Sequence, residues 1–326
     1  MKFDKDLTLI ITSQKNRAKY RNRLLKYIND EISNKIKIIL ITELKPFKVK
    51  YKNVKVIGSN VNTCHYKLFT AQKVVKTKYV AWLADDDFFT REYLKKSVEY
   101  LNKNPKCNCV DAIALRLTKD SLIHLGNYCI PQYLWLKKNQ NILLKSKNFF
   151  DKTLFLDKHD TCGTSIHGVC RNKIFGEFVK TMQKDPFINK IKYGDKIFVF
   201  LMYLNGYIKH LFLVGHIRKD FENQSNKELK NEKKKFENII YNKPALKYLN
   251  DKLKKENLNN KKNDTFFKFY EKIKSKDRNK VKLNFFLKIR LGIYLISNYS
   301  ALKFYIYNFK ILNDFKKEFK KIKKII

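Results

Sequence analysis

The sequence predicts an α/β fold in which helices flank a mostly parallel central sheet. Apolar runs at residues 7–12, 36–42 and 78–84 have the length and composition of strands that are buried on both faces. Segments with helical spacing of apolar residues separate these runs. This alternation predicts right-handed crossovers between parallel strands, with ligands bound at the carboxyl ends of the strands.

The elements follow in order along the chain. The first predicted strand, 7–12, precedes a helix over 16–28 that carries Tyr20, Leu24 and Ile28 at helical spacing. The next predicted elements are a strand over 36–42, a strand over 54–57 that ends at a Gly-Ser-Asn turn, a helix over 62–76 and a strand over 78–84. Further on we expect a helix over 88–101, a strand over 112–117, a helix over 196–204 and a strand over 207–214.

Composition limits the class of protein and of partner. The chain has 326 residues, 44% of them hydrophobic, which is enough for a sizeable core and excludes a disordered chain. The net charge of +41 favours anionic partners such as nucleotides, nucleic acid or acidic lipids. The six cysteines lack zinc-finger spacing, as in a reduced cytosolic protein. No signal peptide is expected from the charged first residues, and no spanning helix is expected because no apolar run is long enough.

Asp85, Asp86 and Asp87 follow directly after a predicted buried strand. Carboxylates gathered at such a point repel one another unless a cation neutralises them, and Mg²⁺ or Mn²⁺ prefers oxygen ligands of this kind. The alternative is that Asp86 or Asp87 caps the helix predicted at 88–101. The metal interpretation is favoured because a chain with few acids places three of them at one strand end.

Three further residues have two interpretations each. Asp195 opens a predicted apolar helix, so it either caps that helix or acts as a general base. His167 and His216 lie beside glycines in polar stretches, where a histidine is often simply structural. We place His216 at a predicted strand end, which favours a third metal ligand or a phosphate contact.

Several motifs, taken in order, resemble the GT-A fold glycosyltransferases, and glycosyltransferase family 2 most closely. LTLIITSQKNR resembles the first strand and its Asn-Arg turn, and IILITE resembles the second strand with its acidic end. KYVAWLADDDFF resembles the strand that delivers the D-x-D motif, and GDKIFVFLMYLNGY resembles the helix that carries the catalytic base. The chain departs from the pattern at Thr12, where proline is usual, and at Gly194, where an acid is usual.

The resemblance implies a GT-A domain over residues 1–221 and an inverting transfer of sugar from a nucleoside diphosphate sugar to a saccharide or lipid-linked acceptor. It implies that Asp195 is the base and that Gly163 and His167 lie on the acceptor side. It also implies Mn²⁺ or Mg²⁺ bound by Asp85, Asp87 and His216. The residues implied for donor binding are Thr12, Ser13, Arg17, Glu43, Lys67, Asp85 and Asp86.

Residues 222–326 are predicted to form a basic, mostly helical C-terminal region. Its last residues place Phe315, Phe319 and Ile322 on one helical face and lysines on the others, which suits an anionic membrane surface. The alternative is that this face packs on the domain or on a second subunit. We therefore expect a cytoplasmic protein on the inner face of the cytoplasmic membrane. By analogy with the family that it resembles, we expect a role in bacterial surface polysaccharide synthesis.

Two other function classes fit part of the sequence. Basic charge interleaved with aromatic residues fits single-stranded nucleic acid, but no recognised nucleic-acid motif occurs and three carboxylates do not suit such a groove, so no specific nucleic acid is expected. A nucleotidyltransferase also places carboxylates at strand ends.

Overall fold

The computed structural model describes residues 3–43, 45–59, 64–117, 123–124, 166–184, 198, 201–202 and 206–219. Asp195, Gly163 and the predicted C-terminal region 222–326 lie outside the described residues, as does most of the helix predicted at 196–204. Among the described residues, no helix is long and apolar enough to cross a membrane.

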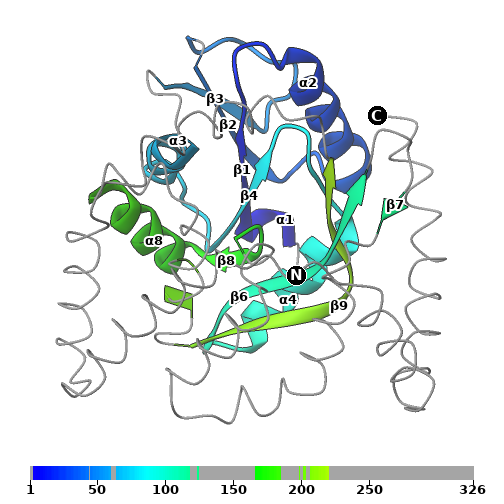
Figure 1. Cartoon of the computed structure of the whole chain (residues 1–326), viewed down its shortest axis with the longest axis vertical. Coiled ribbons are helices and arrows are strands. Elements are labelled where there is room, and N and C mark those ends of the chain that lie inside the picture. The colour runs from blue at the N-terminus through cyan, green and yellow to red at the C-terminus, as the bar shows by residue number, and fades with distance from the viewer. Residues whose placement is uncertain are drawn as a thin grey trace, which may run out of the picture.

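The strands in the described ranges form one nine-stranded sheet in the order β3-β2-β1-β4-β8-β6-β9-β5, with β7 paired to β6 (Figure 1). One side, which we call the parallel half, contains β1 (Leu7–Thr12), β2 (Lys37–Thr42), β3 (Val54–Gly58) and β4 (Tyr79–Ala84). The other side, the mixed half, contains β5 (Phe88–Phe89), β6 (Cys107–Leu117), β7 (Ile123–His124), β8 (Val169–Arg171) and β9 (Tyr207–Lys219).

The parallel half follows the predicted apolar runs closely. β1 pairs with β2 and with β4 in parallel, and β2 pairs with β3 in parallel. Alternate residues of β1 face opposite sides: Leu9 and Ile11 enter one buried cluster, whereas Ile10 enters the other. A strand buried on both faces has no polar face, which is why it appears in the sequence as a continuous apolar run.

Helices cover both faces of the sheet. The first face packs against α1 (Phe3–Asp6), α2 (Ala18–Tyr27), the π-helical turn η1 (Ile28–Ile32) and α4 (Arg91–Lys103). The second face packs against α3 (Cys64–Gln72) and α8 (Asn172–Lys184). The predicted α/β class with a mostly parallel sheet and flanking helices is therefore confirmed for the described residues.

The mixed half corrects three boundaries predicted from the sequence. Residues 88 and 89 were expected to begin a helix, but they form β5, which pairs with β9, and α4 begins only after Thr90. The Thr90 side chain accepts a hydrogen bond from the Tyr93 amide, so Thr90 caps α4 and neither Asp86 nor Asp87 does. β6 begins five residues earlier than predicted, at Cys107.

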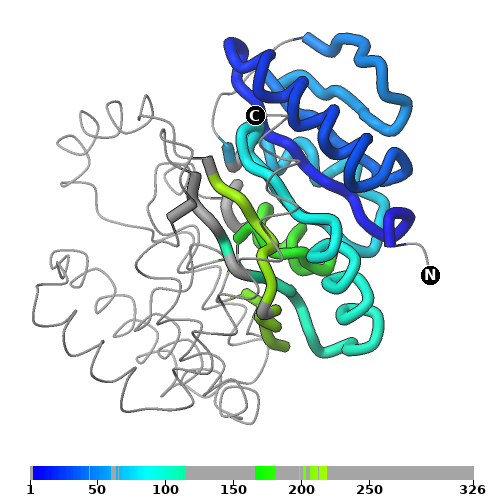
Figure 2. The backbone as a smooth tube through the Cα atoms, turned by 90° about the vertical axis from the view of Figure 1, so that its right-hand side faces the viewer, coloured from blue at the N-terminus to red at the C-terminus, as the bar shows by residue number. Residues whose placement is uncertain are grey.

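The third correction concerns His216. β9 was expected to stop at Val214, but it continues to Lys219 alongside β6, about a hundred residues earlier in the chain (Figure 2). His216 therefore lies inside a strand rather than at its end. The ladder between β5 and β9 sets Phe89 opposite His216, and this pairing brings the histidine next to the aspartate turn.

Candidate functional site: a divided aspartate turn

The aspartate triplet occupies the turn between β4 and β5, where the two halves of the sheet meet. Asp85 and Asp87 are only 3% and 4% exposed, and Asp86 is partly buried. Buried carboxylates require compensating partners. The three acids find them in opposite directions, and this division is the main feature of the site.

Asp85 and Asp86 face the parallel half and share one guanidinium. Arg17 Nε lies 2.7 Å from Asp85 Oδ1, and its Nη2 lies 2.5 Å from Asp86 Oδ2. Ser13 Oγ donates to the other oxygen of Asp85 over 2.6 Å. Burial lowers the pKa of Arg17, but the charges of Asp86 and Asp85 outweigh it and raise the pKa overall. Both oxygens of Asp85 are thus engaged by the chain itself.

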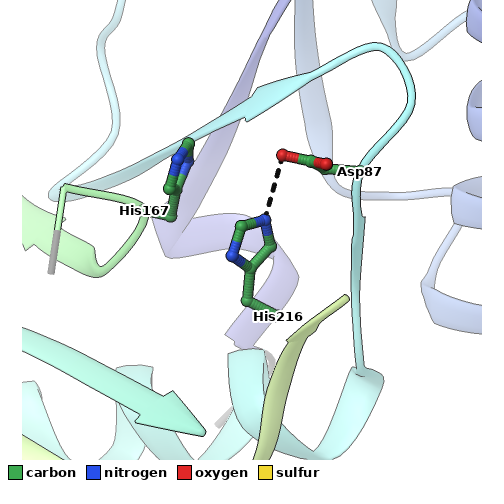
Figure 3. Close-up of side chains that lie close together, drawn as sticks. All are labelled: Asp87, His167 and His216. Carbon is green, nitrogen blue, oxygen red and sulfur yellow. Dashed lines mark hydrogen bonds and ion pairs between the residues drawn. The ribbon is translucent and has the colours of Figure 1, made fainter. Parts of the chain in front are cut away.

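Asp87 faces the mixed half and meets two histidines (Figure 3). His216 Nε2 lies 3.1 Å from Asp87 Oδ2, and the rings of His216 and His167 have centroids 4.5 Å apart. One ligand atom from each of the three residues lies within 4.8 Å of the other two. Together they form the one described group of at least three histidine, cysteine or acidic side chains that is arranged to hold a metal ion.

Adjacent acids in this turn have opposite pKa shifts. Burial and the charge of Asp87 raise the pKa of Asp86, despite its contact with Arg17. Burial also acts to raise the pKa of Asp87, but the charge and hydrogen bond of His216, followed by His167, lower it overall. Asp87 is therefore ionised at neutral pH and available as an anionic ligand.

His167 is held as a neutral imidazole. Burial, and then the neighbouring His216, lower its pKa to about 3. Its Nδ1 lies 3.2 Å from the carbonyl oxygen of Trp82, and its ring stacks on the indole at 4.8 Å between centroids. Because a carbonyl only accepts, the proton resides on Nδ1, which leaves the lone pair of Nε2 free to bind a cation.

The predicted donor-side residues gather at the carboxyl ends of β1 and β2. Lys67, on α3, is buried, and its Nζ lies 3.0 Å from the Ser13 carbonyl oxygen and 2.8 Å from Glu43 Oε1. Thr12 Oγ1 accepts a hydrogen bond of 3.1 Å from Trp82 Nε1. Ser13 joins this group to Asp85, so a continuous network runs from Glu43 to the aspartate turn.

The structure therefore brings together most of the predicted site residues, in two groups. Thr12, Ser13, Arg17, Glu43 and Lys67 lie with Asp85 and Asp86, whereas His167 and His216 lie with Asp87. Asp85, predicted to bind metal beside Asp87 and His216, faces Arg17 instead. Trp82 was not singled out from the sequence, because an aromatic residue in an apolar strand usually belongs to the core.

A second buried acid–histidine pair lacks this arrangement. Asp111 on β6 pairs with His210 on β9, directly opposite in the parallel ladder, and both side chains are buried. Among the described residues no third histidine, cysteine or acid completes that pair into a possible metal-binding group. The Asp87 cluster is therefore distinguished by its third member, His167.

Comparison with known proteins agrees with the resemblance found in the motifs. The model of the family described as Glycosyl transferase family 2 matches residues 10–171, about half of the chain. Among curated proteins, none matches the chain.

Solved structures with a similar backbone include TarS from S. aureus, which is 14% identical, with a TM-score of 0.45 over 66% of this chain and 37% of that chain. They also include S. aureus TarS 1–349 in complex with UDP-GlcNAc, 11% identical, with a TM-score of 0.42 over 67% of this chain and 59% of that chain. This chain thus spans little more than a third of the longer TarS structure.

The family match and the observed sheet, with the aspartate turn after β4, lead to one assignment. Residues 10–171 of the chain belong to glycosyl transferase family 2, and the described residues have the GT-A fold.

Proposed function

We propose that this protein is a metal-dependent glycosyltransferase, which moves a sugar from a nucleoside diphosphate sugar to an acceptor hydroxyl. The observation that carries the proposal is the meeting of two polar groups at the aspartate turn. One is the hydrogen-bonded network of Ser13, Glu43 and Lys67 at the strand ends. The other is the cluster of Asp87, His167 and His216. A nucleoside diphosphate needs neighbouring subsites of these two kinds, one for the nucleoside and one for the diphosphate.

The first group suits a nucleoside. Glu43 offers acceptors and Lys67 offers a donor for heteroatoms of the base or the ribose, and their salt bridge orients both side chains. Ser13 and Asp85 lie between this group and the Asp87 cluster, where we expect the diphosphate. Thr12 lies at the same strand end. Arg17 holds Asp85 and Asp86 on this side of the turn.

The second group suits a divalent cation, because its donor set combines an ionised carboxylate with two imidazoles. His167 donates from Nδ1 to a carbonyl and so presents Nε2, and His216 directs its Nε2 to Asp87, so these three side chains would hold the ion. A divalent cation at this place supplies positive charge for the diphosphate that leaves the sugar.

The base and the acceptor subsite remain proposals, because Asp195 and Gly163 lie outside the described residues. We assign to Asp195 the removal of the acceptor hydroxyl proton. The acceptor oxygen then forms its bond to the anomeric carbon as the bond to the diphosphate oxygen breaks, so the anomeric configuration inverts. The released nucleoside diphosphate carries away the electron pair.

Free nucleoside diphosphate is the product to measure. The untagged full chain, freed of metal with EDTA, is incubated with UDP, GDP and dTDP sugars, with and without Mn²⁺. We expect one donor class to release its nucleotide only when the cation is present. Release of pyrophosphate from a nucleoside triphosphate incubated with a sugar phosphate identifies a nucleotidyltransferase instead, and no release of nucleoside diphosphate from any sugar donor contradicts the proposal.

The assignment of the base has its own test. Asp195→Asn is expected to retain donor binding, seen as a donor-induced rise in melting temperature, but to lose turnover. Asp30→Asn, at an exposed acid on η1, is the matched control and is expected to keep full turnover. Wild-type turnover in Asp195→Asn contradicts the role of Asp195.

We further propose that the basic C-terminal region binds an anionic membrane on its cytoplasmic side, where a lipid-linked acceptor is made. The sequence supports this, because apolar residues 315, 319, 322 and 326 would share one helical face and lysines would cover the other faces. Deletion of residues 316–326 is expected to release the protein from vesicles containing phosphatidylglycerol. Unchanged binding of the deletion variant contradicts the proposal.

A further inference from the structure

The three side chains of the Asp87 cluster come from three separate segments. Asp87 lies in the turn after β4, His167 in the turn just before β8, and His216 within β9. Figure 3 shows the two imidazoles and the carboxylate directed toward one another. Segments so far apart in sequence converge here because β8 and β9 both pair with β6. This pairing fixes the turn that carries His167 relative to the strand that carries His216.

The donor atoms of this cluster differ from those that Mg²⁺ and Ca²⁺ prefer. These ions favour sites made almost entirely of oxygen, whereas imidazole nitrogen suits Co²⁺, Zn²⁺ and other later transition-metal ions better. An oxygen-rich site would need a second aspartate of the turn. Asp85 and Asp86 are instead bound by Arg17, and Ser13 also binds Asp85.

His167 is positioned before any ion arrives. Its Nδ1 is fixed by the Trp82 carbonyl and its ring by the Trp82 indole. A ligating histidine whose other nitrogen donates to a carbonyl is a recurrent arrangement in metal sites, because it sets both the tautomer and the ring orientation.

We propose that His167 is a metal ligand and that Asp87, His167 and His216 form a site selective for transition-metal ions over Mg²⁺ and Ca²⁺. This inference rests on the proposed function and specifies the chemical class of its cation. It concerns metal binding alone, so it is tested without any donor or acceptor.

The test measures metal affinity of the untagged, metal-free full chain by isothermal titration calorimetry with Mn²⁺, Co²⁺, Zn²⁺ and Mg²⁺. We expect one Co²⁺ or Zn²⁺ per chain, bound at least about 100-fold more tightly than Mg²⁺. His167→Gln and His216→Gln are expected to weaken Co²⁺ binding by at least about 10-fold. Asp30→Asn, at an exposed acid on η1 far in sequence from the cluster, is the control and is expected to leave Co²⁺ affinity unchanged.

A second measurement avoids the risk that a histidine variant misfolds. Pulsed electron paramagnetic resonance of the wild-type chain loaded with Cu²⁺ is expected to show ¹⁴N couplings from two imidazoles. Equal affinity for Mg²⁺ and Co²⁺, unchanged Co²⁺ binding in folded His167→Gln, or a spectrum with fewer than two imidazoles overturns the inference.

The two proposals can fail separately. If Mg²⁺ binds as tightly as Co²⁺ and supports sugar transfer, the proposed function stands and the metal selectivity is contradicted. Selective Co²⁺ binding without turnover of any nucleotide sugar leaves the metal site standing and removes the proposed function.

Discussion

The two halves of the sheet place polar side chains in different ways. In the parallel half, Ser13 and Glu43 follow directly after strands, where the carboxyl ends of neighbouring strands meet. In the mixed half, His216 and the Asp111–His210 pair lie inside strands. The aspartate turn joins the halves, with Asp85 directed to the first and Asp87 to the second. Adjacent residues of one chemical type can therefore belong to different subsites.

The largest expected effect separates those two aspartates. Asp87→Asn removes the only carboxylate of the described metal-binding group, so we expect loss of the response to divalent cations and a fall in turnover of at least about 100-fold. Asp85→Asn is expected to raise KM for the donor while the response to metal persists. Steady-state kinetics over a range of Mn²⁺ concentrations measures both. Loss of the metal response in Asp85→Asn alone contradicts the division of the turn.

The next effect tests how Arg17 supports the parallel side of the turn. Arg17→Ala leaves two carboxylates without their cation, and we expect the free energy of unfolding to fall by about 1–3 kcal/mol. We also expect added Mg²⁺ to raise the melting temperature of this variant more than that of the wild type, because the released acids attract a cation. Arg23→Ala, on the same helix, is the control in both measurements. Equal effects of the two substitutions contradict a specific role for Arg17.

A smaller effect is expected at the contact between the halves. Trp82→Phe keeps the backbone carbonyl that binds His167 but removes the indole hydrogen bond to Thr12 and reduces the ring stacking. We expect Co²⁺ affinity to fall by up to about 10-fold, less than in His167→Gln. Calorimetry on Trp82→Phe and His167→Gln shows which substitution weakens Co²⁺ binding more. A larger loss in Trp82→Phe means that the indole matters more than the imidazole.

The last effect is absent at neutral pH and concerns a buried thiol of the mixed half. Burial raises the pKa of Cys107 from 9.0 to about 12. Between these values the unfolded chain has lost a proton that the folded chain retains, so the stability falls as pH rises from 9 to 12, by at most about 1.4 kcal/mol per pH unit for this group. Urea unfolding of Cys107→Ala is expected to show a shallower decline. Cys64→Ala, in a partly exposed position on α3, is expected to follow the wild type.

The difference between the halves also explains what the sequence could predict. The predicted boundaries of β1 and β4 lie within one residue of the observed ones, because strands buried on both faces are apolar throughout. The grouping of Ser13 and Glu43 near the aspartate turn was expected because parallel strand ends share an edge. These predictions needed only local patterns and one rule of topology.

The mixed half could not be predicted in this way. β5 is two residues long and exists through its pairing with β9, more than a hundred residues later, so residues 88–89 looked like the first turn of a helix. The division of the triplet depends on where Arg17 reaches, and the role of His167 depends on the antiparallel pairing of β8. Long-range pairings of this kind leave no periodic signal in the sequence.

One measurement tests the division of the aspartate turn most directly. Crystals of the full chain are soaked with Mn²⁺, and an anomalous difference map is calculated from data collected near the manganese absorption edge. We predict one strong peak bounded by Asp87, His167 and His216, with Arg17 still bound to Asp85 and Asp86. A peak between Asp85 and Asp86, with both histidines away from it and Arg17 displaced, would contradict the metal site proposed for this protein.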